Sequence, residues 1–338
     1  MLEELKRLCT ICGTSGDEGR VREYIISRIK DHCEYSVDPL GSIIAFKKGK
    51  NTPKNKIMLD AHMDEVGLIV TYIQSDGTLT ADMVGGVDPS VVIGRQVLVG
   101  DKLIPGVAGS QAVHKLTKTQ REKKPQMKDI YIDIGAENKE EAEKHIKVGD
   151  LVYFKDDISL LGNKLCSKAI DDRFGCALLI KLIREDIPYD AYFTFTVQEE
   201  IGLRGAKAAA YSVAPDVAIV CETTTASDIE GVSGGDTVCR LGEGAVVSFM
   251  DRSTMYDREL YNIAFDLAEK NNIKCQTKTR IAGGNNSGAV HISGKGVRTA
   301  AVSLPCRYLH SPSCVADIDD MESCYKLVRL LMEKAAVI

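Results

Sequence analysis

Five short segments place acidic or histidine side chains where predicted strands end or predicted helices begin. These segments are AHMDEVG (61–67), KAIDDRFG (168–175), VQEEIG (197–202), CETT (221–224) and RYLHSP (307–312). The carboxyl ends of strands in an open α/β sheet converge on one crevice, where ligands usually bind. Two histidines and at least three carboxylates in one crevice suit a pair of divalent cations, and such ligands suit Zn²⁺ or Co²⁺.

His62 and Asp64 indicate how two of these side chains can cooperate. They are two residues apart, so on an extended strand they face the same way. A carboxylate at Asp64 could then accept the second N–H of a metal-binding imidazole at His62, which fixes the tautomer of the ring. The pair is therefore expected to supply a metal ligand and the group that orients it.

Glu199 and Glu200 follow the apolar, β-branched run AYFTFTV (191–197), which predicts a buried strand. Two adjacent carboxylates repel each other there unless a cation compensates their charge. Because neighbouring side chains on a strand point in opposite directions, the two are not expected to bind the same ion. One could bind metal while the other takes a proton from a metal-bound water molecule. Residue chemistry alone does not decide which glutamate has which role.

Each of these features has a purely structural alternative. A lone histidine at a strand end is more often a hydrogen-bonded structural residue than a ligand. Asp171 and Asp172 could cap the helix predicted by DDRFGCALLIKLIRE, because acidic residues favour a helix N-terminus. The two glutamates could lie in a solvated turn, although the apolar run before them favours burial. The presence of all the features in one chain favours a two-metal site.

The elements that would position these residues alternate along much of the chain. Two helices are predicted at 2–12 and 18–33, with Ser15 or Asp17 as the N-cap of the second, and strand-like runs follow at 42–49 and 55–62. From about residue 165 the pattern alternates between helix and strand. This alternation predicts an α/β fold, with helices on both faces of a sheet.

Between these parts the segment 67–160 has a different character. Short β-branched runs are separated by Gly, Asp and Pro, which is typical of a small β-rich domain. We therefore predict a discontinuous α/β catalytic domain at 1–66 and 161–338, interrupted by an inserted β-rich domain at 67–160.

The overall composition argues against several classes of partner. A net charge of −5 gives no reason to expect nucleic acid or an anionic membrane surface, and no apolar run approaches the ~20 residues that span a bilayer. The cysteines number eleven, which is odd, and no signal peptide is recognisable at the N-terminus. Reduced thiols and a cytoplasmic location are therefore predicted.

Taken in order along the chain, the five segments resemble those of the tetrahedral (TET-type) dinuclear metallo-aminopeptidases, whose members are also called glutamyl aminopeptidase, deblocking aminopeptidase or endoglucanase M. The similarity extends over essentially the whole chain. The resemblance implies a zinc-exopeptidase-type α/β domain with an inserted PDZ-like domain that serves as a dimerisation or lid domain. It also implies a homo-oligomer, a dodecamer built from dimers, with active sites facing inward.

The resemblance also assigns roles to individual residues. Glu199 matches the general base, Asp64 the residue that orients His62, and Asp171 the bridging ligand. Glu200 matches a ligand of one ion and Glu222 a ligand of the other. The implied metal ligands are His62, Asp171, Glu200, Glu222 and His310. His114, in the inserted segment, is expected to be structural or lid-related and to lie outside the site.

One segment departs from the family pattern. Where the family usually has Gly-Thr-Asp-Ala after a glycine run, this chain has GGNNSGAVH (283–291), with Asn285, Asn286 and Ser287. The implied metal ligands do not include this segment, so the metal site is expected to persist. The wall that binds the substrate side chain is the part expected to differ.

The leading hypothesis is a metal-dependent aminopeptidase that removes N-terminal residues from short peptides. Two carboxylates could also hydrolyse glycosides, but a chain without Trp and with 6% aromatic residues offers few rings for stacking on sugars. A third alternative is a non-catalytic shell or binding protein descended from the enzyme. The altered glycine segment permits it, whereas the complete set of ligand positions disfavours it.

Overall fold

A computed structural model describes residues 1–338, apart from the side chains at positions 113 and 120. Its larger part is built on one mixed sheet whose four central strands are parallel. These are, in spatial order, β12 (Ala191–Thr196), β3 (Ile57–His62), β13 (Val217–Thr225) and β16 (Arg298–Arg307). All residues of β3 are buried, because helices cover both faces of the sheet.

Antiparallel strands extend the sheet on both sides. β2 (Ile43–Lys47) and β1 (Glu34–Val37) lie beyond β12, whereas β17 (Cys314–Asp317), β11 (Lys164–Ser167) and β10 (Ser159–Leu161) follow β16. β14 (Ala245–Val247) pairs with both β16 and β15 (Cys275–Thr277).

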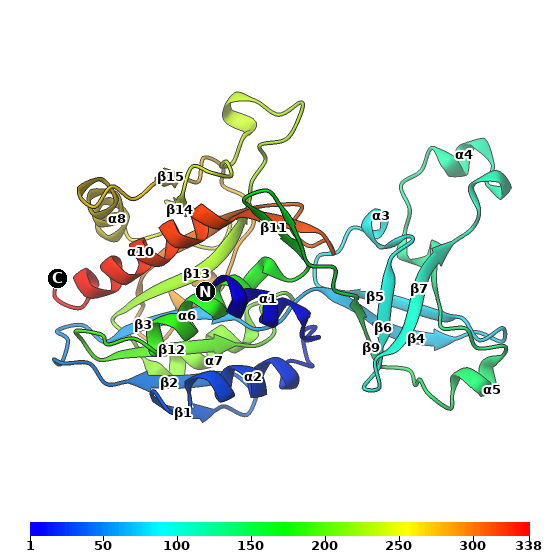
Figure 1. Ribbon diagram of the computed structural model, residues 1–338, viewed down its shortest axis with the longest axis horizontal. Coiled ribbons are helices and arrows are strands. Elements are labelled where there is room, and N and C mark those ends of the chain that lie inside the picture. Colours follow the sequence, from blue (N-terminus) through cyan, green and yellow to red (C-terminus); the bar gives the residue numbers. More distant parts are fainter.

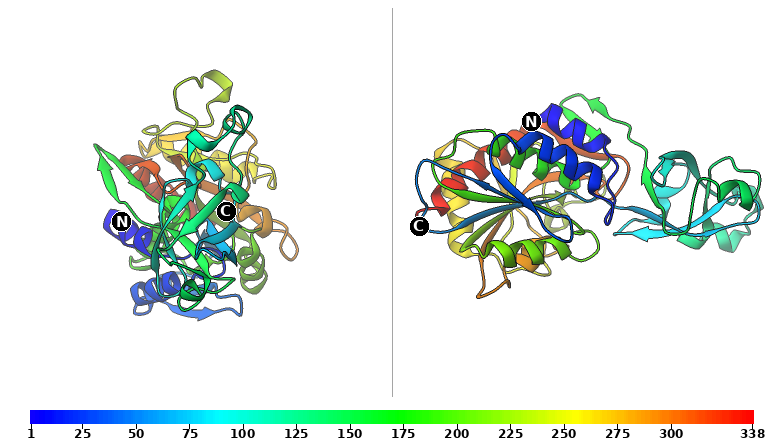
Figure 2. Two further views of the ribbon diagram at one scale, coloured as in Figure 1. Left: turned by 90° about the vertical axis from the view of Figure 1, so that its right-hand side faces the viewer. Right: turned by 90° about the horizontal axis from the view of Figure 1, so that it is seen from below.

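Helices form a layer on each face of this sheet. One layer contains α1 (Leu2–Thr10), α2 (Gly19–Ile29), α6 (Ile170–Ile183) and α10 (Ile318–Ala335), with α8 (Arg258–Lys270) packed on α10. The opposite layer contains α7 (Arg204–Val213) and α9 (Ser287–Val290). The right-hand view of Figure 2 shows the sheet between the N-terminal helices and α7. The predicted α/β fold class is therefore confirmed.

The smaller part of the molecule is a closed barrel with its own apolar core, at the right of Figure 1. Around the barrel the strands are β4 (Gly67–Ile73), β5 (Leu79–Val84), β8 (Ile130–Asp133), β7 (Ile104–Ser110), β6 (Gln96–Val99) and β9 (Leu151–Phe154). Short helices α3 (Pro89–Val92), α4 (Lys118–Arg121) and α5 (Lys139–Ala142) lie in its connections. The division of the chain into domains at 67 and 160 stays a prediction.

The predicted N-cap of the second helix is wrong. α2 begins after Glu18, and no side chain caps its first turn. Ser15 instead donates its hydroxyl hydrogen to Asp64, and the Asp17 carboxylate pairs with Arg20 and accepts a hydrogen bond from Tyr153. Both residues are thus used for contacts between segments rather than for capping. Among the helices of the described residues, none is both long and apolar enough to cross a bilayer.

Candidate active site

The carboxyl ends of the central strands surround one cavity of about 570 Å³. The residues predicted from the sequence that line it are His62, Asp171, Glu199, Glu200, Glu222 and His310. They come from β3, from β13, from the start of α6, and from the segments that follow β12 and β16. Asp64 lies behind His62, fully buried, and is absent from the cavity lining. His114 is exposed in the barrel and contributes nothing to this lining.

The Asp171 carboxylate lies between the two imidazole rings. Its Oδ1 is 3.3 Å from Nε2 of His62, and its Oδ2 is 3.6 Å from Nε2 of His310. Nε2 of His310 also lies 3.3 Å from Oε2 of Glu200. Each oxygen of one carboxylate therefore faces a different histidine, as a ligand that bridges two cations would.

Two sets of donor atoms are compact enough to hold a metal ion. One set comprises His62, Asp171 and Glu200, and the other comprises His62, Asp172 and Glu222, with the atoms of each set within 4.8 Å of one another. The sequence predicts only a capping role for Asp172, and the structure adds it to the second donor set. Its adjacency to Asp171 was the available signal. The peptide bond between these two aspartates is cis.

Both histidines are oriented by contacts to Nδ1. Nδ1 of His62 lies 3.1 Å from the backbone oxygen of Asp64 and 3.4 Å from its Oδ1. Nδ1 of His310 lies 3.1 Å from the backbone oxygen of Gly86, which belongs to the inserted segment after β5. A proton on Nδ1 of each ring would leave Nε2 free to bind metal. The role of Gly86 was not foreseen from the sequence.

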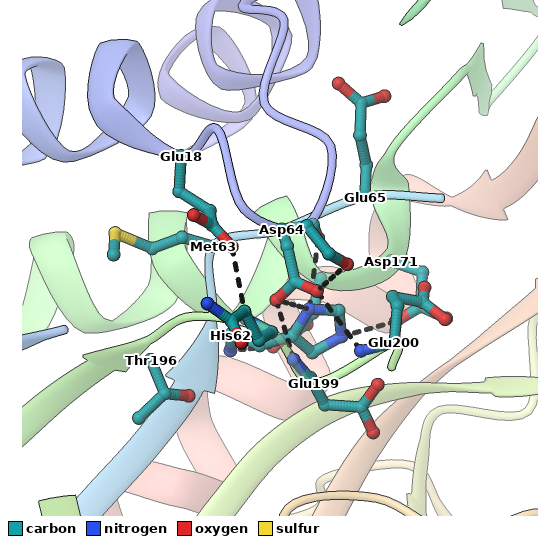
Figure 3. A network of polar contacts seen from close by, with 12 residues as sticks. Glu18, His62, Met63, Asp64, Glu65, Asp171, Thr196, Glu199 and Glu200 are labelled. Carbon is teal, nitrogen blue, oxygen red and sulfur yellow. Dashed lines mark hydrogen bonds and ion pairs between the residues drawn. The ribbon is translucent and has the colours of Figure 1, made fainter. Parts of the chain in front are cut away.

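The two adjacent glutamates lie in a turn, so the prediction that strand geometry separates them is wrong. β12 ends at Thr196, and Gln198 has a φ of +57° in the left-handed region. The backbone N–H groups of Glu199 and Glu200 then donate to Oδ1 and Oδ2 of Asp64, at 3.0 and 3.1 Å (Figure 3). Asp64 therefore fixes this turn as well as the imidazole of His62.

The electrostatics of the cluster indicate a deficit of positive charge. Burial raises the pKa of Glu222, and repulsion from Asp172 adds to the effect; burial likewise raises the pKa of Glu200, with Asp171 as the main repelling charge. Burial also raises the pKa of Glu199, to about 7. Within the described residues, Oε1 of Glu222 is buried and has no hydrogen-bond partner.

The histidines respond in the opposite sense to the same charges. The Asp171 carboxylate raises the pKa of His310 to about 10, with burial acting against it. Burial lowers the pKa of His62, but Glu222 and the other carboxylates outweigh it, so the net shift is upward. The imidazole and carboxylate donors, together with the unpaired Oε1 of Glu222, fit divalent cations. Such cations would displace the protons from Nε2 of the two histidines on binding.

The segment that departs from the family pattern lies in the wall of the cavity. Gly283, Gly284 and Asn285 contribute to the lining, whereas Asn286 is fully buried behind it. Nδ2 of Asn286 donates to Oδ2 of Asp60 at 2.7 Å. An aspartate at this position would repel Asp60, so the amide suits its neighbour. The segment contributes no member to either donor set.

An α/β sheet with imidazole and carboxylate donors gathered at its strand ends is typical of metal-dependent hydrolases. The chain belongs to the M42 glutamyl aminopeptidase family, whose model matches residues 41–327. A putative aminopeptidase of Acetivibrio thermocellus is 41% identical over 331 residues, which cover 97% of each chain.

Solved structures agree with this membership. An aminopeptidase from the archaeon Desulfurococcus kamchatkensis superposes with a TM-score of 0.93 at 33% identity, covering 98% of this chain and 94% of the other. The TET1 peptidase of Pyrococcus horikoshii, which can assemble into a tetrahedron or a large octahedral shell, superposes with a TM-score of 0.86 at 34% identity and 99% coverage of both chains. The chain is therefore an aminopeptidase, a peptide hydrolase that uses divalent metal ions, as the leading hypothesis from the sequence predicts.

Proposed function

We propose that this aminopeptidase removes N-terminal residues from short peptides with two divalent cations, Zn²⁺ or Co²⁺, bound at the strand ends. The position of the Asp171 carboxylate between His62 and His310 carries this proposal. Asp171 would bridge the two ions, with Glu200 and His310 completing one site. His62 and Glu222 would complete the other, and Asp172 lies close enough to contribute.

When bound, the two ions would lower the pKa of a water molecule and polarise the scissile carbonyl group. Glu199 would take a proton from this nucleophile and deliver it to the leaving amine, as a general base and then a general acid. Its side chain lines the cavity but belongs to neither donor set, so it is free for this role. Asp64 would hold His62 and the backbone of both glutamates in place.

Removal of the metal provides the direct test. Protein dialysed against a strong chelator is expected to hydrolyse an aminoacyl-p-nitroanilide with a kcat at least ~100-fold lower. Without the ions no water molecule has a lowered pKa, so Glu199 has no activated water from which to take a proton. The factor of ~100 is the lower end of what a general base contributes. Titration with Zn²⁺ or Co²⁺ should restore activity as two equivalents bind, measured by elemental analysis of the same samples. Full activity of metal-free protein would contradict the proposal.

The cavity wall favours substrates with an acidic N-terminal residue. Lys278 lines the cavity with 9% of its surface exposed, and its Nζ donates to the backbone oxygen of Ala282 at 2.9 Å. Arg252 also lines it, and no ion pair or side-chain hydrogen bond is found for this residue among the described residues. Burial lowers the pKa of Lys278, while the charge of Asp251 acts in the opposite direction. We propose that the two cations receive a glutamyl or aspartyl side chain.

Lys278→Met tests this preference. Hydrogen bonds to charged groups contribute about 1.5–3 kcal/mol, so kcat/KM for a glutamyl substrate should fall about 10- to 100-fold relative to a leucyl substrate. Lys274→Met is the matched control, because Lys274 also donates to a backbone oxygen, that of Gly242, but lies outside the lining. An unchanged ratio of the two substrates in Lys278→Met would exclude the assignment.

The assembly and location of the protein are further proposals. One solved neighbour is a dodecamer, and the TET1 peptidase can assemble into a tetrahedron or a large octahedral shell. These neighbours support a homo-oligomer, proposed here as a dodecamer built from dimers. The inserted barrel, proposed as a separate domain at 67–160, would form the dimer contact or a lid. Among the described residues all eleven cysteines are free thiols, which supports the cytoplasm as the location.

A further inference from the structure

We infer that the loop between α1 and α2 acts as a positioning element of the metal site through the side chains of Ser15 and Glu18. This inference rests on the proposed function, because it concerns how the metal ligands and the general base are held. Neither residue lines the cavity, and neither belongs to a donor set. Both are almost fully buried, with 5% and 4% of their surfaces exposed.

Ser15 acts on Asp64. Its Oγ donates to Oδ2 of Asp64 at 2.6 Å, a short bond to a carboxylate that is fully buried. The same carboxylate accepts from the backbone N–H groups of Glu199 and Glu200 and faces Nδ1 of His62. The hydroxyl of Ser15 therefore holds the group that orients a metal ligand.

Glu18 acts on the turn that carries the two catalytic glutamates. Its Oε1 accepts from the backbone N–H of Gly16 at 2.8 Å and from the backbone N–H of Gln198 at 3.2 Å. Gln198 is the residue in the left-handed region, a conformation that a non-glycine residue rarely adopts without support from its surroundings. Glu18 thus supports the turn from one side, while Asp64 supports it from the other.

The loop is itself anchored firmly enough to serve as a support. The backbone N–H of Glu65 donates to the oxygen of Gly13 at 3.0 Å, and Oε1 of Glu65 accepts from the N–H of Gly13 at 3.2 Å. Arg173, fully buried, donates to the backbone oxygens of Leu8 and Ile11 at 2.6 and 3.0 Å. The bonds between Gly13 and Glu65 join the loop to the segment that follows β3, and those of Arg173 join its beginning and the end of α1 to α6. In Figure 3 the chain that carries Glu18 runs past Asp64.

A purely structural role would attach the N-terminal helices to the sheet without affecting the metal. A small substitution distinguishes the two roles by its effects on metal affinity and on the stability of the metal-free protein. If Ser15 and Glu18 position the site, loss of their contacts should weaken metal binding even in protein that remains folded. Partners of this kind typically contribute about 10- to 100-fold to metal affinity. If they only attach helices, the stability of the metal-free protein should fall while the affinity of folded protein for metal stays the same.

The experiment compares variants that remove each contact with variants that keep it. Ser15→Ala and Glu18→Ala remove the contacts, whereas Ser15→Thr keeps a hydroxyl and Glu18→Gln keeps the accepting oxygen. Ser27→Ala and Glu23→Ala on the exposed side of α2 are controls. Full-length protein is stripped of metal, and the Zn²⁺ dissociation constant is measured by competition with a chromophoric chelator. Urea unfolding of the metal-free protein is measured in parallel.

We expect a 10- to 100-fold weaker Zn²⁺ affinity for Ser15→Ala and Glu18→Ala, and affinities near that of the parent protein for the conservative variants and controls. Should one alanine variant fail to fold, the Zn²⁺ affinity of the other decides; should both fail, Ser15→Gly and Glu18→Asp, which also withdraw the hydroxyl or the accepting oxygen, take their place in the same measurement. Parent-like affinity in both folded alanine variants would overturn the inference. Absence of Zn²⁺ binding by the parent protein would instead contradict the proposed function.

Discussion

Glu199→Gln is expected to lower kcat by at least ~100-fold while two metal ions remain bound. The amide has nearly the shape of the carboxylate but cannot take the proton of the attacking water, and general bases contribute about 10²–10⁴-fold. Glu199 belongs to neither donor set, and its contact with Asp64 is made by the backbone N–H, which the substitution keeps. KM should change little, because the lost interaction belongs to the transition state.

The neighbouring residue supplies the matched comparison. Glu200→Gln alters a member of a donor set that lies 3.3 Å from His310, so this variant should lose metal as well as activity. Elemental analysis and steady-state kinetics on the two purified variants separate the roles. Substantial activity in Glu199→Gln would exclude it as the base. Loss of metal from Glu199→Gln with full metal in Glu200→Gln would mean that the two roles are reversed.

Apolar strand runs that end at acidic or histidine residues were enough to predict the gathering of the site residues. In an α/β sheet the strand direction determines which end carries ligands, so His62 and Glu222 could be expected at one edge without knowledge of their contacts. The inserted β-rich segment could also be predicted, since its turn residues and short β-branched runs differ from the alternating pattern around it. The edge of the sheet that carries the site and the inserted β-rich segment could both be predicted because each is encoded by residues close together in the sequence.

The remaining features depend on contacts between distant segments. The turn at Gln198 is supported by Glu18, and the tautomer of His310 by a backbone oxygen at Gly86. A backbone oxygen has no signature in the side-chain sequence. Ser15 was predicted as a helix cap, because a serine before a helix usually is one. Only the folded chain brings Asp64 close enough to take that hydroxyl instead.

The position of the inserted barrel gives Gly86 a further significance. The barrel and the sheet have separate apolar cores. Nevertheless, Gly86 in a loop of the barrel contacts the proposed metal ligand His310. A Cβ at Gly86 would lie 3.2 Å from Nδ1 of His310, so a larger residue there would crowd the ring. The orientation of His310 therefore depends in part on a contact with the loop that follows β5.

Asp171→Asn is expected to have the other large effect, a loss of bound metal and of kcat/KM greater than the ~10- to 100-fold typical of residues that only support a ligand. An amide carries no charge and offers one oxygen, whereas the carboxylate presents Oδ1 to His62 and Oδ2 to His310. Both sites lose a ligand when the bridge is removed, so the weaker of the two ions should be lost first. Elemental analysis across a Zn²⁺ titration should then give fewer than two equivalents of bound metal.

Asp172→Asn distinguishes the bridge from its neighbour. Asp172 accepts the backbone N–H of His62 through Oδ2 at 3.3 Å and that of Gly175 through Oδ1 at 2.9 Å, and an asparagine can keep one of these bonds. If Asp171 is the bridge, Asp172→Asn should retain more metal than Asp171→Asn does, and Asp266→Asn on the exposed side of α8 should match the parent. Two full equivalents in Asp171→Asn, with depletion in Asp172→Asn, would move the bridge to the second aspartate.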